Sequence, residues 1–414
     1  MKPSKRPLSA RDSATRRGNL VSALAAEPSH GARAPKGSSP FQCIALLLQG
    51  GGALGAYQGG VYQALIEAKL QPDWVAGISI GAINAALIAG NAPEARVACL
   101  RKFWKMVAPT RALDSLAQLE PMSWMRGDAA RGLRNQLSAG AAIMGGVPSF
   151  FEPRIPMAWL HAPGSLEATS YYDTARLRST LEHLIDFDRI NSGEMRFSVG
   201  AVNVTSGNFV YFDNTTHTIR PEHVMASGAL PPAFPAIEID GEFYWDGGLV
   251  SNTPLQWVLE TEPQRDTLAF QVDLWNARGI FPRNMAEVMT RQKEIQYSSR
   301  TRSNSDRFRH LQMLRNTLAS LLERLPAGLQ DLPELEVLRP VASARAFNIV
   351  QLIYRAKGHE GDSKDYEFSR LSMEEHWRAG YHDTLRTLRH PEVLQRPDNI
   401  EGVLMFDLGQ HGRE

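Results

Sequence analysis

The sequence predicts an α/β protein with a mainly parallel sheet, and two units of the chain carry that prediction. An apolar run, Cys43–Leu48, meets a glycine cluster and then a helical pattern. A second apolar piece, residues 74–76, meets another glycine turn and a helix of small residues. Continuous apolar strands that alternate with helices are typical of parallel sheets covered on both faces.

The second glycine turn contains a candidate nucleophile. Its sequence, Gly77-Ile78-Ser79-Ile80-Gly81, has the form G-x-S-x-G. In such a turn the serine lies between strand and helix, the flanking glycines remove Cβ clashes, and the hydroxyl is exposed at a helix N-terminus that favours negative charge. The alternative is an ordinary tight turn in which the serine only caps the helix.

The first glycine turn is a candidate oxyanion hole. Consecutive glycines after a buried strand let backbone N–H groups converge on one point. The cluster also spells G-x-G-x-x-G through Gly50, Gly52 and Gly55, which is a dinucleotide-binding fingerprint. That fingerprint requires an acidic residue after the second strand, about 20 residues on. Asp73 has the spacing but precedes the strand, so the cofactor hypothesis stays open as the weaker one.

A candidate base for the serine lies far downstream. Residues 238–248 read as a hairpin followed by a glycine turn that presents Asp246. A carboxylate within hydrogen-bond reach of the hydroxyl could take its proton directly. The alternative is a turn aspartate, because Asp-Gly is a common turn signal. A serine–histidine–acid triad through His217 or His223 is weaker, since α/β-hydrolases usually place the histidine after the acid.

Three ordered motifs, G-G-G-A-L-G, G-I-S-I-G and D-G-G, resemble those of the patatin-like phospholipase family. The resemblance runs from about residue 43 to about residue 259 and includes the flanking stretches 226–235 and 252–255. It implies a three-layer α/β/α fold with a mainly parallel central sheet. It also implies a serine–aspartate dyad without a catalytic histidine, a glycine-rich oxyanion loop, and no cofactor or metal.

The resemblance assigns a role to each matching residue. It places the nucleophile at Ser79 and the base at Asp246, with the amides of Gly51 and Gly52 as oxyanion donors and that of Ala53 as a further candidate. The remaining site residues are the oxyanion loop Gly50, Gly51, Gly52, Ala53 and Gly55, the nucleophile turn Gly77 and Gly81, and the base loop Gly247 and Gly248. Leu54 stands where family members often carry arginine or lysine, so a charge contact to an anionic head group is in doubt.

Composition excludes several classes of protein. The chain has 414 residues, 43% hydrophobic content and a net charge of +1, which suits a sizeable core and argues against a nucleic-acid binder. Only Cys43 and Cys99 are present, so neither a disulfide framework nor a cysteine-rich metal site is expected. No stretch reaches the roughly 18 to 20 apolar residues of a spanning helix. We expect a cytoplasmic protein, with peripheral contact to the inner membrane left open.

The chain divides into four predicted parts. Residues 1–40 form a disordered basic tail, 41–265 the acyl hydrolase domain, 266–400 a mostly helical extension and 401–414 a second tail. Residues 108–164 read as irregular and are a candidate border of an acyl pocket, with a core helical hairpin as the alternative. Helices are expected at 96–107, 173–184, 285–325 with a break near Ser303, and 372–388, and strands at 197–204, 208–212, 268–274 and 347–354.

These patterns predict a serine acyl hydrolase, a phospholipase A or lipid esterase that forms an acyl-enzyme. Two alternatives stay open. One is a dinucleotide-binding oxidoreductase that uses the Gly50–Gly55 loop. The other is a catalytically silent lipid-binding scaffold with the same fold. The stretch 360–368 resembles the C-terminal extension of a bacterial subgroup of the family, whose role the sequence does not reveal.

Overall fold

A computed structural model gives the structure of residues 40–108, 128–261, 265–298, 301–330, 332–357 and 360–410. Within these residues the strands of the main sheet are β1 (Cys43–Leu48), β2 (Trp74–Gly77), β5 (Arg196–Asn203), β6 (Phe209–Asp213), β7 (Ile237–Ile239), β8 (Glu242–Asp246), β9 (Thr267–Asp273), β10 (Phe347–Ile353) and β11 (Val403–Phe406). They form one sheet in the order β11-β10-β9-β1-β2-β5-β8-β7, with β6 paired to β5. Every pair from β11 to β5 is parallel, while β6, β7 and β8 pair antiparallel. The predicted mainly parallel sheet is confirmed.

Strand β1 lies in the middle of this sheet and is buried along its whole length. Its alternate side chains enter two different cores. Ile44, Leu46 and Leu48 pack into one cluster, and the intervening Ala45 and Leu47 pack into a second cluster on the opposite face. Burial on both faces explains why the strand reads as an unbroken apolar run without alternation.

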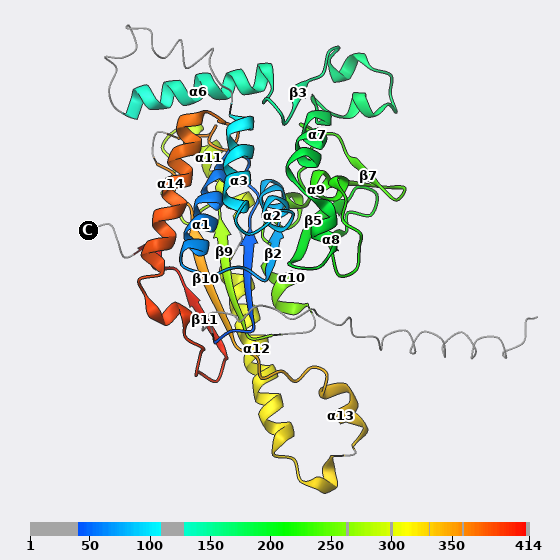
Figure 1. Ribbon diagram of the computed structural model, residues 1–414, viewed down its shortest axis with the longest axis vertical. Helices are drawn as coiled ribbons and strands as arrows, with labels where there is room; N and C mark the ends of the chain where they lie inside the picture. The colour runs from blue at the N-terminus through cyan, green and yellow to red at the C-terminus, as the bar shows by residue number, and fades with distance from the viewer. Residues whose placement is uncertain are drawn as a thin grey trace, which may run out of the picture. The chain divides into compact units, whose positions relative to one another are not determined.

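Helices cover both faces of the sheet and complete the three layers (Figure 1). The helices of the structure are α1 (Ala56–Glu67), α2 (Ile80–Ala89), α3 (Arg96–Val107), α6 (Asp128–Gly145), α7 (Ala175–Leu184), α8 (Phe187–Asn191), α9 (Pro221–Ser227), α10 (Leu255–Glu260), α11 (Met285–Tyr297), α12 (Thr301–Glu323), α13 (Pro333–Leu338) and α14 (Arg370–Thr387). Helices α1, α2, α3 and α14 contribute to the first core cluster, whereas α10 and Phe308 of α12 contribute to the second.

Helix α14 packs against α1, although more than 300 residues separate them in the sequence. Two glycines permit this close approach. A Cβ atom on Gly60 would lie 1.9 Å from the carbonyl oxygen of Trp377, and one on Gly380 would lie 2.0 Å from the carbonyl oxygen of Tyr57. The backbones of the two helices are therefore in direct contact. Through α14 the C-terminal part of the chain contributes to the first core cluster.

Most of the predicted elements are confirmed within about two residues. The structure contains the expected helices α3, α7 and α14, the hairpin β5-β6 and the strands β9 and β10. The expected break near Ser303 is wrong, because α11 ends at Tyr297 and Ser303 lies inside α12. The expectation of irregular structure after α3 is wrong for residues 128–145, which form α6. Residues 109–127 of that stretch lie outside the described residues.

The C-terminal region contributes strands as well as helices. Strands β9, β10 and β11 extend the sheet beyond β1, and β11 includes residues of the predicted tail 401–414. The division of the chain at residues 265 and 266 stays a prediction, and both stretches supply strands to one sheet. The predicted basic tail, apart from Pro40, lies outside the described residues. No helix in the described ranges has the length and apolar character needed to cross a bilayer.

Candidate active site

Ser79 lies where β2 ends and α2 begins, as the G-x-S-x-G pattern predicts. It has φ of 56° and ψ of −125°, a strained conformation for a residue with a side chain. Its N–H donates to the hydroxyl and to the carbonyl oxygen of Ser227, both at 3.1 Å. A Cβ atom on Gly77 would lie 2.2 Å from the carbonyl oxygen of Gly81, and one on Gly81 would lie 2.2 Å from that of Leu48. Only glycine fits at these two positions.

Asp246 is the last residue of β8 and is buried. It is the N-cap of a 3₁₀ turn, Gly247–Leu249. Its carboxyl accepts a 2.7 Å hydrogen bond from the N–H of Gly248, and the neighbouring Ser79 hydroxyl acts to lower its pKa. A Cβ atom on Gly247 would lie 2.6 Å from the carbonyl oxygen of Gly200, so the base loop lies close against β5. The structure thus brings the two candidate catalytic residues together at one cavity.

Burial decides the protonation of Asp246. Removal from water raises the pKa of its carboxyl to about 7, although the hydrogen bonds from Ser79 and Gly248 oppose that increase. The group therefore exchanges its proton near neutral pH, where a general base is most effective.

The glycine loop presents two backbone N–H groups without a protein acceptor. The N–H of Gly50 donates to the carbonyl oxygen of Asn252 at 3.3 Å, and that of Ala53 donates to the carbonyl oxygen of Asp365 at 2.8 Å. Among the described residues, no acceptor is present for the N–H groups of Gly51 and Gly52. Gly52 has φ of +55°, and a Cβ atom there would lie 2.0 Å from the carbonyl oxygen of Asp365.

Buried side chains hold the start of this loop in place. The carbonyl oxygen of Gly50 accepts hydrogen bonds of 3.0 Å from the Asn252 amide and from the Trp275 indole. The Gln49 side chain accepts from the N–H groups of Leu274 and Trp275, at 2.6 and 3.0 Å. The loop is therefore tied to the end of β9 and to the base loop.

A second set of buried amides holds the end of the loop. Asn84 of α2 donates to the carbonyl oxygen of Gly55 at 3.0 Å and to the Gln58 side chain at 2.8 Å. The Gln58 amide in turn donates to the carbonyl oxygen of Gln49 at 2.7 Å. These roles were not predicted from the sequence. The available signal was Asn84, the only polar side chain in the otherwise apolar sequence of α2.

A cavity of about 290 Å³ opens beside Ser79 and Asp246. Gly50, Gly51 and Gly52 line the end that holds the two candidate catalytic residues. Most other lining side chains are apolar or aromatic, including Ile83, Ala142, Ile143, Phe150, Phe151, Leu230, Phe234 and Phe368. The stretch expected to border a pocket does so through the end of α6 and the loop that follows. Leu54 is fully buried in the core and is not part of the lining.

No histidine lines this cavity in the described part of the chain. His223 is buried at the N-terminus of α9, where its Nδ1 accepts a 2.9 Å hydrogen bond from the N–H of Arg220. Burial lowers its pKa to about 4. His217 packs on the ring of Phe212. Both histidines therefore have structural contacts, and neither lines the cavity with Ser79 and Asp246.

Asp73 does not lie near the glycine loop. Its carboxylate accepts a 2.9 Å hydrogen bond from the N–H of Ile44, at the amino ends of β1 and β2. The glycine loop follows the carboxyl end of β1, at the opposite edge of the sheet. Within the described ranges, no group of three or more histidine, cysteine or acidic side chains is placed to hold a metal ion.

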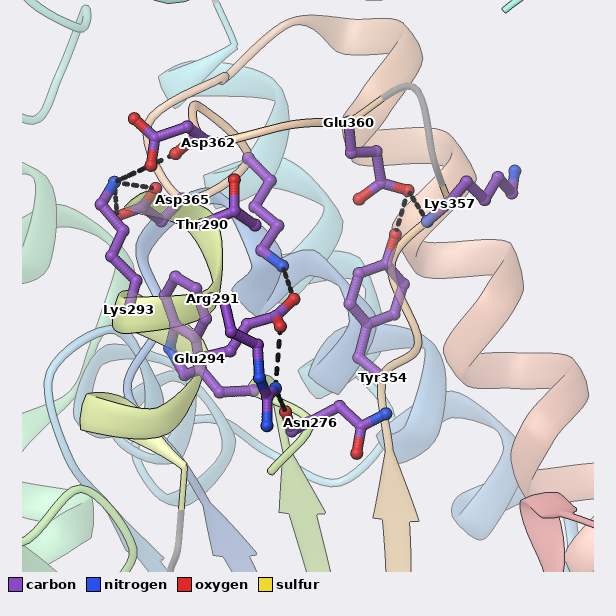
Figure 2. Close-up of polar contacts among 12 residues, drawn as sticks. Asn276, Thr290, Arg291, Lys293, Glu294, Tyr354, Lys357, Glu360, Asp362 and Asp365 are labelled. Atoms are coloured by element: carbon purple, nitrogen blue, oxygen red, sulfur yellow. Dashed lines mark hydrogen bonds and ion pairs between the residues drawn. The ribbon is translucent and has the colours of Figure 1, made fainter. Parts of the chain in front are cut away.

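The C-terminal region adds residues to the site that the sequence did not indicate. Asp365, Tyr366 and Phe368, in the segment before α14, line the cavity. Figure 2 shows Lys293 of α11 pointing toward Asp365 and Asp362, and Glu294 pointing the other way, toward Arg291. The extension therefore forms one wall of the candidate active site.

Fold and site together define an α/β protein with a serine and a buried carboxyl group that line one cavity at the carboxyl edge of a parallel sheet. Residues 46–258 match the family described as patatin-like phospholipase, and residues 295–400 match a second family described as patatin phospholipase. The first match covers more than half of the chain, so the chain belongs to the patatin-like phospholipase family. The family is one of lipid acyl hydrolases, which act on lipid substrates.

Other comparisons add little. The search of curated proteins found no match. Among solved structures, the chain is similar to the crystal structure of VipD from Legionella pneumophila, with a TM-score of 0.39 and 15% sequence identity. That similarity covers 90% of this chain and 73% of VipD.

Proposed function

We propose that this protein is a serine acyl hydrolase that cleaves fatty-acyl esters of lipids through a Ser79–Asp246 dyad. The observation that carries the proposal is the position of the Ser79 hydroxyl beside the buried Asp246 carboxyl, within a largely apolar cavity. Family membership supports the general activity, and the proximity of the two groups supports their assignment.

The reaction begins with Ser79. Its hydroxyl oxygen attacks the ester carbonyl carbon while Asp246 takes the hydroxyl proton. The strained turn holds this oxygen at the N-terminus of α2, whose dipole favours the developing negative charge. Because the pKa of Asp246 is about 7, the carboxyl is ionised often enough to accept the proton near neutral pH.

The N–H groups of Gly51 and Gly52 are the proposed oxyanion donors. They have no acceptor among the described residues and line the cavity beside Ser79. The N–H groups of Gly50 and Ala53 are already bonded to Asn252 and Asp365, so in this proposal they hold the loop in shape. A donor that binds the oxyanion of the transition state more strongly than the substrate typically lowers the activation free energy by about 2.7–4 kcal/mol.

The second half of the reaction restores the serine. Protonated Asp246 gives its proton to the alcohol that leaves, and an acyl-serine ester stays on Ser79. The same carboxylate then removes a proton from a water molecule that attacks the acyl carbon. The fatty acid departs as the proton returns to Ser79. The dyad completes this cycle without a cofactor or a metal, and the apolar cavity is the proposed site of the acyl chain.

Hydrolysis of a medium-chain p-nitrophenyl ester and of a lipid ester panel tests the proposal. Ser79→Ala and Asp246→Asn are each expected to lower kcat by a factor of about 10³ or more. Asp240→Asn is a matched control, because Asp240 precedes a glycine in the same hairpin but is exposed. Full activity in either dyad variant would contradict the proposal.

The two alternatives predict different results. A dinucleotide-dependent enzyme would tolerate Ser79→Ala and would turn over only with a nicotinamide or flavin cofactor. The position of Asp73 at the far edge of the sheet counts against it. A silent scaffold would hydrolyse no ester even as wild type. A cytoplasmic location and contact with a membrane surface stay predictions.

A further inference from the structure

The cavity lining contains acidic side chains but no basic ones among the described residues. Among the described lining residues, the ionisable acids are Asp246 and Asp365, and no lysine, arginine or histidine is present. Asp246 is buried beside Ser79, and Asp365 lies over the glycine loop through its carbonyl contact with Ala53. An ester bound at Ser79 therefore meets carboxyl groups and aromatic rings but no cation.

Two lysines, Lys293 and Lys364, lie close to the residues that line the cavity. Each is hydrogen-bonded to an acidic side chain. The ammonium of Lys293 donates to both carboxylate oxygens of Asp365, at 3.0 and 3.3 Å, and to the carbonyl oxygen of Asp362 at 3.0 Å (Figure 2). Lys364 is nearly buried and donates to Glu294 at 2.7 Å.

Their distance from the cavity is short. The ammonium of Lys293 lies 4.9 Å from the ring centre of Tyr366, and that of Lys364 lies 5.2 Å from the ring of Trp275. Both rings line the cavity. Burial lowers the pKa of Lys293, but the carboxylates of Asp365 and Asp362 outweigh burial and raise it, so Lys293 stays charged. Both ammonium groups are therefore close to the cavity lining, and each is hydrogen-bonded to an acidic partner.

An anionic head group would be unfavourable in this arrangement. In a glycerophospholipid the phosphate is only a few bonds from the scissile ester, so it would lie near Asp246, which must be ionised to act. Repulsion between two like charges about 6 Å apart at a protein surface lowers binding or rate by a factor of about 10 to 100. No side chain of the described lining offers a compensating cation.

We propose that the site selects lipid esters whose alcohol part is uncharged, such as acylglycerols, and that the Lys293–Asp365 pair determines this selectivity. Asp365 binds the Lys293 ammonium and so withholds it from an anionic substrate. The inference rests on the proposed function, because it concerns the ester bound at Ser79. It gives the C-terminal extension a role, since both members of the pair lie beyond residue 265.

The test compares diacylglycerol with phosphatidic acid of the same acyl chains, since these lipids differ only in the phosphate. Each is supplied at low mole fraction in nonionic detergent micelles, which keeps the surface charge small. Wild type is expected to have a kcat/KM for diacylglycerol at least about 10-fold above that for phosphatidic acid.

Variants separate the charge effect from a structural one. Asp365→Asn retains the backbone carbonyl that holds Ala53 but removes one of the two acidic partners of Lys293, so the preference is expected to fall about 5- to 10-fold. The double variant Asp365→Asn with Lys293→Met is expected to restore it. Asp407→Asn is a matched control, because the Arg355–Asp407 pair has a similar length and exposure but does not line the cavity.

Each outcome decides the inference. Equal hydrolysis of the two lipids by wild type would overturn the inference and leave the proposed function intact. Activity on a p-nitrophenyl ester alone would overturn the inference and the lipid substrate, and would leave only the ester hydrolase activity. A preference that Asp365→Asn lowers equally with and without Lys293 would overturn the role of the pair. Absence of hydrolysis of both lipids and of the p-nitrophenyl ester would overturn the proposed function as well.

Discussion

The main-chain N–H of Ala53 donates a 2.8 Å hydrogen bond to the carbonyl oxygen of Asp365. Ala53 belongs to the glycine loop in the first family match, and Asp365 belongs to the second. The contact closes the C-terminal region onto the loop. Within the part of the chain that the structure describes, the N–H groups of Gly51 and Gly52 have no protein acceptor. The two matched regions therefore form one site.

Gly52→Ala is expected to damage catalysis, because a Cβ atom there would lie 2.0 Å from the carbonyl oxygen of Asp365 and φ is +55°. The loop would have to move, and the loss of an aligned oxyanion donor costs about 10²–10³ in kcat. Steady-state kinetics on a p-nitrophenyl ester would measure it.

Gly207→Ala is the matched control for that substitution. Gly207 has φ of +69°, a Cβ atom there would meet nothing within 4 Å, and it does not line the cavity. We expect wild-type kcat and a loss of stability of about 1 kcal/mol from backbone strain. Equal effects of the two substitutions on kcat would argue against a role for the loop.

The rate should depend on the ionisation of Asp246. Because burial raises its pKa to about 7 and the base acts only when ionised, kcat/KM should fall tenfold per pH unit below pH about 7 and level off above it. A pH profile with an ester whose leaving group does not titrate in this range tests the prediction. A rate that is constant from pH about 5 to 8 would contradict it.

The same shift predicts a pH-dependent cost in stability. A carboxyl whose pKa is raised on folding contributes stability below its unfolded value, near 4, and that contribution is lost as the pH rises through about 7. The amide introduced by Asp246→Asn does not titrate. The free energy of unfolding of this variant, relative to that of wild type, should therefore rise by on the order of 3–4 kcal/mol between pH 4 and pH 8.

Urea unfolding of both proteins at pH about 4 and 8 measures that gain. Asp240→Asn serves as the control, since the hydrogen bond from Arg220 lowers the pKa of Asp240 and no gain at high pH is expected. A stability difference between wild type and Asp246→Asn that does not change with pH would show that the carboxyl is not desolvated in the folded protein.

The size of the cavity should set the acyl chain length. Ala142 of α6 is buried and lines the cavity, so Ala142→Phe would occupy part of its volume of about 290 Å³. We expect kcat/KM for long-chain p-nitrophenyl esters to fall at least about 10-fold while short-chain esters are retained. Met144→Phe, on the exposed side of the same helix, is the control.

Much of the central fold is predictable because it depends on local patterns. The apolar run at β1, the glycine turn around Ser79 and the Asp-Gly turn at Asp246 each reflect a local requirement that only a few residue types satisfy. Such requirements can be recognised from a single sequence. The structure places these residues, chosen from their separate turns, around one cavity.

The supports of the site were not predictable for a different reason. Gln49 and Asn252 act through hydrogen bonds to residues more than 200 positions away, and the spacing around a single amide in the sequence does not indicate such a distant partner. The carbonyl group of Asp365 acts irrespective of its side chain, so no motif could indicate it. Helix α6 was missed because its small residues and glycines resemble a loop.

The most direct test of the account is to find which residue a fluorophosphonate modifies. After reaction with the probe and digestion, mass spectrometry should locate one adduct on Ser79, with none in Ser79→Ala and labelling of Asp246→Asn slowed at least about 10²-fold. An adduct on another serine, or undiminished labelling of Ser79→Ala, would contradict the proposed dyad.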